Sequence, residues 1–230
     1  MTLAVAHRGD PFAAVENTLA AFAAALDAGA GMVEIDVRRC ADGEVAVVHD
    51  ETLERIWGNP RRVGELTLAE VQATAVNGQR IPSFAEVLAT VDAPLMVDYE
   101  ERGVVEPALA AIDAAAAFDR CLFAGENIAG HRRIRELVPE ARIALTWCDA
   151  APPPDALLDE LGVEFFNPPF ELLTSELVAA MHARGTDVST WTVDDEGEME
   201  RVLAAGADAV ISNRIGRLVE LLDAREAAQC

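Results

Sequence analysis

An eight-stranded α/β barrel is the fold that this 230-residue sequence predicts. Three observations favour it: short apolar runs rich in β-branched residues recur along the chain, stretches of helical period lie between most of them, and several of these stretches end in glycine. Repeated strand and helix units favour a parallel sheet with its helices outside, and eight such units close into a barrel. The length and the 51% of hydrophobic residues suit one core, so we expect a single domain over residues 1–230.

Nine segments of five or six residues are predicted to be strands, because each is mostly apolar and bounded by polar or turn-forming residues. They are residues 3–7, 32–37, 45–49, 95–99, 120–124, 142–147, 163–167, 187–191 and 208–212. Six stretches with apolar residues at helical spacing separate most of them. They are residues 17–29, 83–91, 104–117, 129–138, 175–185 and 195–206. Gly29, Gly185 and Gly206 end three of these stretches, as expected where a helix runs into a strand.

The nine predicted strands are one more than an eight-stranded barrel needs. A hairpin within the second barrel strand accounts for the extra one. The tripeptide 41–43, Ala-Asp-Gly, separates two β-like arms, residues 32–40 and 44–49, and Asp-Gly between such arms is a strong hairpin signal. We therefore expect one barrel strand with an antiparallel return. Pairing across this turn places His49 opposite residues 34–36, so local geometry brings a histidine beside two carboxylates.

Residues 51–82 are the least regular part of the chain. They contain the turn-forming strings Gly-Asn-Pro and Asn-Gly-Gln and one short helix-like stretch at residues 67–74. We expect them to form a cap or a long loop over one end of the barrel. Residues 149–156 include three consecutive prolines and predict a turn-rich loop between a strand and a helix.

The composition excludes some classes of function. The 40 acidic and 18 basic residues give a formal net charge of -22, and the resulting negative field repels the phosphates of nucleic acids. A DNA or RNA partner is therefore not expected. A small anionic phosphodiester is repelled as well, so an enzyme for such a substrate needs a local positive centre such as a bound cation or an arginine.

The cysteines and the N-terminus bear on location. Cys40, Cys121, Cys148 and Cys230 lie far apart with no Cys-x-x-Cys pair, as is typical of free thiols in a reducing cytoplasm. Residues 1–10 lack the basic region of a signal peptide, and no segment approaches the 18 apolar residues of a membrane span. We expect a cytoplasmic protein with no membrane span, and the sequence leaves its oligomeric state open.

The tripeptide His7-Arg8-Gly9 directly follows the first predicted strand, where the carboxyl end of a barrel collects its catalytic side chains. A histidine can move a proton near neutral pH, an arginine can bind a phosphate through two donors, and a glycine lets the backbone approach a ligand. The alternative is a histidine at a strand end beside a solvated arginine, and three residues do not decide between the two.

Two pairs of acids, each two residues apart on a predicted strand, are candidate metal ligands. Glu34 and Asp36 share one face of their strand, and the apolar residues between and beside them require burial of the other face, so these acids face the barrel interior. Asp98 and Glu100 repeat the pattern, and both are expected to point inward. Oxygen ligands from Glu34, Asp36 and Asp98 suit Mg²⁺ or Ca²⁺ better than zinc. The alternative is an ordinary network of salt bridges with arginines that are close in sequence, namely Arg8, Arg38 and Arg102.

Other catalytic motifs are absent from the sequence. It contains no nucleophile elbow, no P-loop and no Gly-x-Gly-x-x-Gly turn. His131 and His182 lie on predicted helices and are expected to face solvent, so neither is assigned to the site.

These residues, in this order, resemble the glycerophosphodiester phosphodiesterase family. The resemblance begins with AHRGD and continues through VENTLAAFAAALDAGAGMVEIDVRRCADGEVAVVHDETLER. It resumes with IPSFAEVL, HARGTDVSTWTVDDEGEMERVLAAGADAVIS and a final helix, so it covers nearly the whole chain. The N-terminal block is specific, because HRG, ENT, ExD, DG and HD occur together at fitting spacings.

The resemblance implies a TIM (β/α)8 barrel that uses a divalent cation to hydrolyse phosphodiesters of glycerol, often glycerophosphocholine or its relatives, to glycerol 3-phosphate and an alcohol. His7 and His49 match the general acid and base of the family. Arg8 matches its phosphate-binding arginine, and Trp191 matches an aromatic wall beside the glycerol moiety. The metal ligands that the resemblance implies are Glu34, Asp36 and Asp98.

The sequence departs from the family pattern most clearly at Glu100. Where the family has Glu-x-Lys on its third barrel strand, this chain has Asp98-Tyr99-Glu100, so an acid replaces the phosphate-binding lysine. This change removes a stabiliser of developing negative charge and adds repulsion. We expect Glu100 to lie at the substrate and to recruit a second cation or a cationic head group. The alternatives are a catalytically impaired barrel that binds a phosphodiester or a metal without normal turnover, and a barrel phospholipase or lyase.

Overall fold

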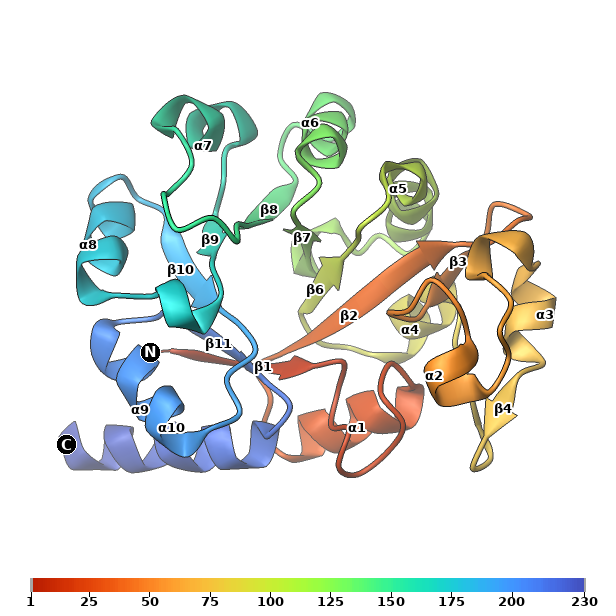
Figure 1. The fold of residues 1–230 in the computed structure, drawn as a ribbon, viewed down its shortest axis with the longest axis horizontal. Coiled ribbons are helices and arrows are strands. Elements are labelled where there is room, and N and C mark those ends of the chain that lie inside the picture. Colours follow the sequence, from red (N-terminus) through yellow and green to blue (C-terminus); the bar gives the residue numbers. More distant parts are fainter. Residues whose placement is uncertain (1, 230) are drawn as a thin grey trace.

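The computed structural model describes residues 2–229 and contains the predicted barrel (Figure 1). Eight parallel strands are hydrogen-bonded in the order β1-β11-β10-β9-β8-β7-β6-β2, and β1 pairs with β2 to close the ring. The barrel strands are β1 (Leu3–His7), β2 (Met32–Arg39), β6 (Leu95–Asp98), β7 (Cys121–Gly125), β8 (Arg142–Thr146), β9 (Phe165–Asn167), β10 (Asp187–Thr190) and β11 (Ala209–Ser212). The predicted fold class is therefore confirmed.

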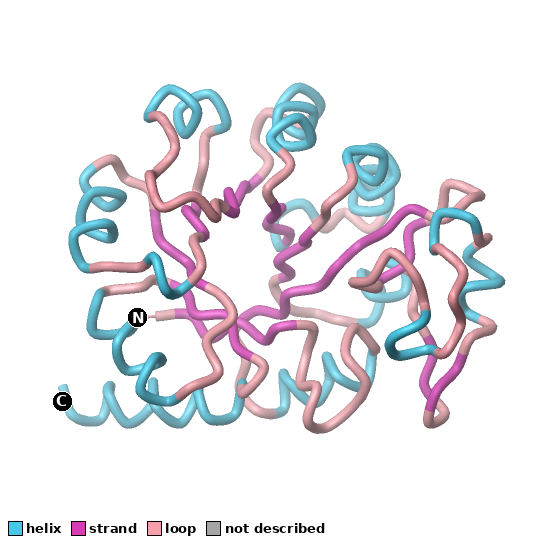
Figure 2. Tube along the Cα trace, viewed as in Figure 1, coloured by secondary structure: helices cyan, strands magenta, loops and turns pink. Residues whose placement is uncertain are grey.

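Helices surround the strands on the outside (Figure 2). They are α1 (Leu19–Asp27), α4 (Phe84–Thr90), α5 (Val105–Ala114), α6 (Ile128–Leu137), α7 (Asp155–Leu161), α8 (Ser175–Ala183), α9 (Glu196–Ala205) and α10 (Ile215–Gln229). Helix α7 lies outside the six predicted stretches, because the three prolines before it predict a turn-rich loop that overlaps its first residues. Gly206 follows α9 at a φ of 96°, the left-handed conformation that ends a helix and that glycine adopts without strain.

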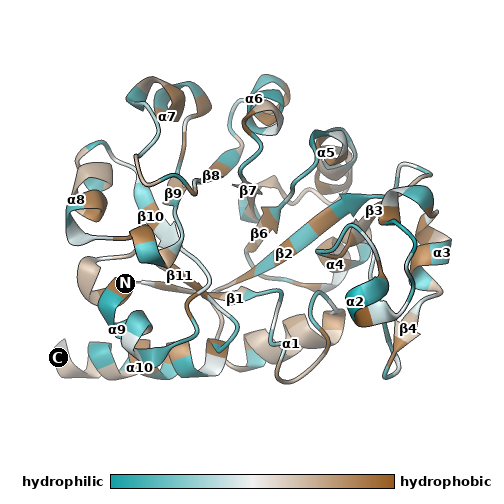
Figure 3. Cartoon of the chain, viewed as in Figure 1, coloured by the Kyte–Doolittle hydropathy of each residue, from teal (hydrophilic) through white to brown (hydrophobic). Residues whose placement is uncertain are grey.

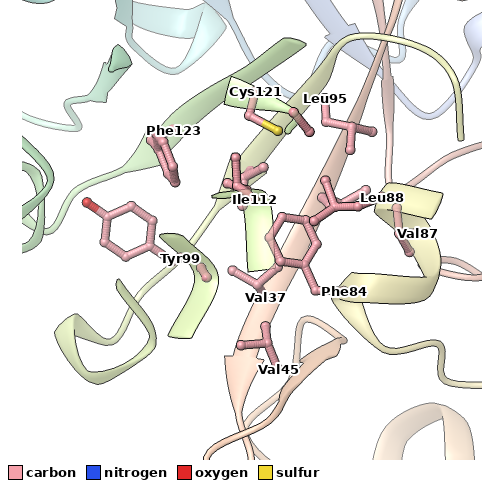
Figure 4. Packing of buried hydrophobic residues seen from close by; sticks show 14 of the residues in the cluster. Val37, Val45, Phe84, Val87, Leu88, Leu95, Tyr99, Ile112, Cys121 and Phe123 are labelled. Carbon is pink, nitrogen blue, oxygen red and sulfur yellow. The ribbon is translucent and has the colours of Figure 1, made fainter. Parts of the chain in front are cut away.

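Hydrophobic and hydrophilic residues alternate along β2 (Figure 3), and successive residues of a strand point to opposite faces. Val33, Ile35 and Val37 pack in the apolar layer between the sheet and the outer helices, part of which is drawn in Figure 4. Met32 belongs to a separate cluster that fills the barrel interior. The other buried members of that cluster are Val5, Met96, Leu122, Ala124, Ala144, Phe165, Ala209 and Ile211.

The predicted hairpin is present. Strand β3 (Val45–Val47) pairs antiparallel with β2, with Val37 opposite Val47, and the N–H of Val48 donates to the carbonyl of Asp36 at 2.9 Å. This register carries the return strand toward the middle of β2, where the acids lie. His49 therefore reaches the same region as Glu34, as the turn predicts.

Residues 51–82 lie beside the β2–β3 hairpin, at one side of the barrel (Figure 1). They contain α2 (Glu54–Trp57), α3 (Leu68–Gln72) and a small hairpin of β4 (Ala75–Val76) and β5 (Gln79–Arg80). Their apolar side chains join those of the hairpin in one buried cluster. Its members are Cys40, Ala46, Val48, Leu53, Trp57, Val63, Leu66, Val71 and Ile81.

Cys40, Cys121 and Cys148 are free thiols, as expected, and Cys230 lies outside the described residues. Burial raises the pKa of the Cys121 thiol to about 11, which makes it unreactive. Across residues 2–229, none of the helices has both the length and the apolar character that crossing a membrane requires.

Candidate active site

A cavity of about 500 Å³ lies at the carboxyl ends of the barrel strands. All the residues that the sequence assigns to the site line this cavity. They are His7, Arg8, Glu34, Asp36, His49, Asp98, Glu100 and Trp191. Because parallel strands of a barrel all end on the same face, residues far apart in the sequence meet there.

A chain of hydrogen bonds holds His7 in one tautomer. Its Nδ1 lies 2.8 Å from Oδ1 of Asn213, and Nδ2 of Asn213 donates to Asp194 at 2.7 Å, which fixes the orientation of the amide. Because the amide oxygen can only accept, Nδ1 of His7 carries the proton and Nε2 is left to accept one. Burial, followed by the charge of Arg8, lowers the pKa of His7. The ring is therefore neutral near pH 7 and suited to act as a base.

The backbone turns sharply after His7. Both Arg8 and Gly9 are in the left-handed region, with φ of 57° and 87°. A Cβ on Gly9 would lie 2.6 Å from the backbone of Ala21, so this position requires glycine. The turn directs the backbone N–H of Arg8 toward Glu34, whose Oε2 accepts it at 3.0 Å.

The guanidinium of Arg8 lies between two acids at the cavity wall. Its Nη1 donates to Glu16 at 3.0 Å. Its Nε lies 3.0 Å from Oδ2 of Asp36, but the N–H is not aligned with that oxygen, and this buried nitrogen has no hydrogen-bond partner among residues 2–229. The short distance provides charge attraction, and the guanidinium as a whole lines the cavity, where it can attract a phosphate.

Three carboxylates line the cavity from two adjacent strands, in which Asp36 of β2 and Asp98 of β6 are register partners. Burial and the neighbouring charge of Asp36 raise the pKa of Glu34 well above its usual range. Burial and the same neighbour raise the pKa of Asp98 to about 7. A bound cation relieves such repulsion between desolvated acids, and carboxylate oxygens are the ligands that Mg²⁺ and Ca²⁺ prefer. The donor types present therefore fit a divalent cation, and a bound ion would draw the three carboxylates closer, because their ligand atoms do not all lie within 4.8 Å of one another.

Asp36 has partners of its own, because it accepts from Nδ2 of Asn17 at 2.7 Å and faces Arg8. The other two acids form no ion pair in the described part of the chain, so the salt-bridge alternative does not account for them. Among residues 2–229, one set of three acidic or histidine groups has its ligand atoms within 4.8 Å of one another, namely His182, Asp187 and Asp208. This set lies at the opposite end of the barrel, where Nε2 of His182 lies 2.6 Å from Oδ2 of Asp208.

His49 lies just after β3 and is oriented from two sides. Its Nδ1 lies 2.7 Å from Oδ1 of Asp50, and its backbone carbonyl accepts from Nε of Arg38. Asp50 in turn accepts from Nε of Arg55 at 2.5 Å. Against the opposing effect of burial, the hydrogen bonds from Arg55 and His49 lower the pKa of Asp50. The carboxylate therefore keeps its charge and can stabilise a protonated His49 ring.

Glu100 lines the cavity from its rim. Strand β6 ends at Asp98, and the side chain of Glu100 is 62% exposed. It pairs with Nη2 of the buried Arg38 at 2.5 Å, and Arg38 also pairs with Glu101 at 3.2 Å. One guanidinium is thus shared by two rim carboxylates, which leaves a net negative charge on this side of the cavity.

Trp191 forms the wall on the opposite side. It follows β10, which lies four strands from β6 around the ring. Its indole N–H donates to the carbonyl of Asn167 at 3.2 Å. The Asn167 side chain is itself held by Thr146 at 3.1 Å and by Ser189 at 2.8 Å, so the indole rests on a fixed polar layer.

The expectation that His131 faces solvent is wrong, whereas His182 is exposed as expected. His131 is fully buried on the inner face of α6, together with Gly130 and Ile134. Its position three residues before Ile134 is the sequence signal that places it on the apolar face. Asn213 was also missed, although it directly follows β11, which is the same kind of position that identified His7.

The fold and the cavity together define an α/β-barrel enzyme in which histidines, an arginine and carboxylates meet at the carboxyl ends of the strands. The chain belongs to the glycerophosphoryl diester phosphodiesterase family, whose sequence profile matches residues 7–217. The protein is therefore a phosphoric diester hydrolase by class.

Similarity to individual proteins extends over nearly the whole chain. A glycerophosphodiester phosphodiesterase from Caldanaerobacter subterraneus subsp. tengcongensis is 29% identical over 237 residues, which cover 96% of this chain and 98% of that relative. One from Bacillus altitudinis is 27% identical with the same coverage. The solved structure of an Oleispira antarctica phosphodiesterase in complex with the product sn-glycerol-3-phosphate has a TM-score of 0.90 at 22% identity, over 97% of each chain. At that identity the structure supports the fold alone.

Proposed function

We propose that this protein hydrolyses glycerophosphodiesters to glycerol 3-phosphate and an alcohol. The observation that carries the proposal is the convergence of two histidines, an arginine and three acids on one cavity. The curated relatives are named for the same activity, and the Oleispira structure contains sn-glycerol-3-phosphate. A chain with a formal charge of -22 needs a local positive centre to bind such an anion, and this cavity has room for one.

In the proposed site, Glu34, Asp36 and Asp98 hold one divalent cation, Mg²⁺ or Ca²⁺. When bound, such an ion neutralises a phosphate oxygen and stabilises the charge that develops during displacement. The raised pKa values of Glu34 and Asp98 support this assignment, because a cation replaces the protons that otherwise relieve the repulsion. The guanidinium of Arg8, which lines the cavity, supplies a second positive contact for the phosphate.

The hydrogen bonds of the two histidines support a role for each. Nε2 of His7 is unprotonated, so it accepts the proton of the attacking hydroxyl, which belongs to water or to a neighbouring hydroxyl of the substrate. A new P–O bond forms while the P–O bond to the alcohol breaks. His49, whose Nδ1 faces the carboxylate of Asp50, gives its proton to the departing oxygen. Where the substrate hydroxyl attacks, the first product is a cyclic phosphate that water then opens.

Trp191 and Glu100 are proposed to contact opposite ends of the substrate, because they lie on opposite sides of the cavity. The indole provides an apolar face for the glycerol moiety. The rim acids Glu100 and Glu101 share a single arginine, so this side favours an alcohol that carries a positive charge.

We further propose that residues 1–230 form one domain in which residues 51–82 are a cap inserted after β3. The apolar cluster that this segment shares with the β2–β3 hairpin supports the proposal. A single unfolding transition is the expected result when circular dichroism is compared with the Trp57 fluorescence of a variant in which Trp147 and Trp191 are replaced by phenylalanine. Separate transitions for the two probes would contradict it.

The activity is tested with a panel of glycerophosphodiesters that carry cationic, neutral and anionic alcohols. Purified protein is assayed after EDTA treatment and again after addition of Mg²⁺, Ca²⁺ or Mn²⁺. We expect glycerol 3-phosphate to be released only with added ion. Release that EDTA leaves unchanged would refute metal dependence, and no release from any diester under any condition would refute the activity.

The two histidines are tested by separate substitution. His7→Ala and His49→Ala are each expected to lower kcat by at least roughly a hundredfold, the usual contribution of a positioned acid or base. His182→Ala is the matched control, because His182 is exposed at the opposite end of the barrel. Near-normal turnover by either site variant would overturn the acid and base assignment.

A further inference from the structure

Tyr99 lines the cavity together with its neighbours Asp98 and Glu100, but the residue is buried and packs in the apolar layer under α5 and α6. The residue is 2% exposed and packs in the same cluster as Phe123 and Ile112. Figure 4 shows its hydroxyl pointing away from the labelled apolar side chains. A buried hydroxyl requires a hydrogen-bond partner, and α6 supplies one.

His131 of α6 binds that hydroxyl and the end of the next strand at the same time. Its Nδ1 lies 2.8 Å from the Tyr99 hydroxyl, and its Nε2 lies 2.9 Å from the carbonyl of Gly125. Because a carbonyl can only accept, Nε2 carries the proton and Nδ1 accepts from the tyrosine. Burial lowers the pKa of His131 to about 4, so this neutral tautomer persists across the physiological range. Two hydrogen bonds therefore join the residue after Asp98 to the last residue of β7.

Two glycines close tightly around Tyr99 and fix its position. A Cβ on Gly130 would lie 2.6 Å from the Tyr99 ring, and a Cβ on Gly125 would lie 2.6 Å from its backbone carbonyl oxygen. The N–H of Tyr99 also donates to Ala124 at 3.3 Å. The ring and the backbone of this residue have no space in which to shift.

The segments joined in this way carry one wall of the cavity. Asp98 and Glu100 line it from β6, and Gly125, Glu126 and Asn127 line it from β7. Protein interiors are close-packed. Loss of the hydrogen bonds from His131 to Tyr99 and Gly125 therefore moves the ends of β6 and β7.

We infer that Tyr99 and His131 are positioning residues that hold Asp98 at the depth and angle at which it can share a cation with Glu34 and Asp36. Both act through Asp98, because Tyr99 and His131 are buried. This inference rests on the proposed role of Asp98 as a metal ligand. Groups that orient a ligand of this kind typically change metal affinity by about 10- to 100-fold when they are removed.

The test measures Mg²⁺ affinity by isothermal titration calorimetry without any diester, so it does not depend on turnover. His131→Leu removes both hydrogen bonds, and Tyr99→Phe removes one while keeping the ring. Each is expected to raise the Kd for Mg²⁺ by about tenfold or more. His131→Gln is the conservative variant, because its amide can accept from Tyr99 and donate to Gly125. We expect His131→Gln to keep the Kd for Mg²⁺ within about threefold of the wild-type value.

Val178→Ala is the control for a purely structural role. Val178 is buried on α8, in the cluster on the other side of the barrel, so its truncation lowers stability without touching this wall. We expect it to leave the Kd unchanged. The inference is overturned if Val178→Ala raises the Kd as much as His131→Leu does, or if both Tyr99→Phe and His131→Leu bind Mg²⁺ as the wild type does.

Asp98→Asn separates a failure of this inference from a failure of the proposed function. If Asp98→Asn loses affinity while the Tyr99 and His131 variants keep it, the ligand set stands and the positioning role is refuted. If Asp98→Asn itself binds Mg²⁺ as the wild type does, the proposed ligand set fails, and the positioning role fails with it.

Discussion

Burial of His131 makes the stability of this fold depend on pH within a defined window. Its pKa is lowered to about 4 in the folded protein, whereas a histidine in an unfolded chain has a pKa of about 6.5. Below pH 6.5 the unfolded state therefore binds a proton that the folded state excludes. This contribution to stability is fully present above about pH 6.5 and is lost progressively as the pH falls toward 4.

The size of the effect follows from the two pKa values. A difference of one in pKa corresponds to about 1.4 kcal/mol, so the difference between about 6.5 and about 4 corresponds to roughly 3 kcal/mol. The 40 acidic residues titrate in an overlapping range, so the wild type alone does not isolate this contribution. His131→Gln isolates it, because glutamine can make the same two hydrogen bonds and does not titrate.

Urea unfolding of both proteins, followed by circular dichroism at several pH values from 7.5 to 4.5, measures the difference. Between these limits the wild type is expected to lose about 2 to 3 kcal/mol more free energy of unfolding than His131→Gln. Carboxylates contribute equally to both curves and cancel in the comparison. Parallel curves would show that His131 takes up a proton as readily in the folded state as in the unfolded state, and would refute the neutral tautomer on which the Tyr99–His131–Gly125 hydrogen bonds depend.

Three further substitutions test the site and the core. Asn213→Ala removes the acceptor of the His7 Nδ1–H, so kcat is expected to fall by about 10- to 100-fold with little change in KM. An unchanged kcat contradicts the tautomer assigned to His7. Phe84→Ala empties a fully buried position, so urea titrations are expected to show a free energy of unfolding that is lower by about 3 to 5 kcal/mol. A loss below about 1 kcal/mol would show that the core repacks. Glu100→Lys reverses an exposed charge at the rim of the cavity, so the kcat/KM for diesters of cationic alcohols, relative to that for diesters of neutral alcohols, is expected to fall by about fivefold. An unchanged ratio for every diester refutes a role of Glu100 in substrate selection.

The barrel and most of its site follow from local features of the sequence. Strand and helix periods can be detected within ten to fifteen residues, and the Asp42-Gly43 turn sets the register of the β2–β3 hairpin by itself. The rule that parallel strands end on one face then collects His7, Glu34 and Asp98 at the same cavity, because it needs only the position of each residue in its own strand.

Only the tertiary structure decided how these residues are held. The acceptor for His7 lies 206 positions away at Asn213, and the tyrosine that buries His131 lies 32 positions away on another element. Such contacts depend on the distance and angle between packed segments, which no local period encodes. Helical spacing places His131 on the same face of α6 as Ile134, but only the tertiary structure shows that its ring binds Tyr99 and Gly125 there.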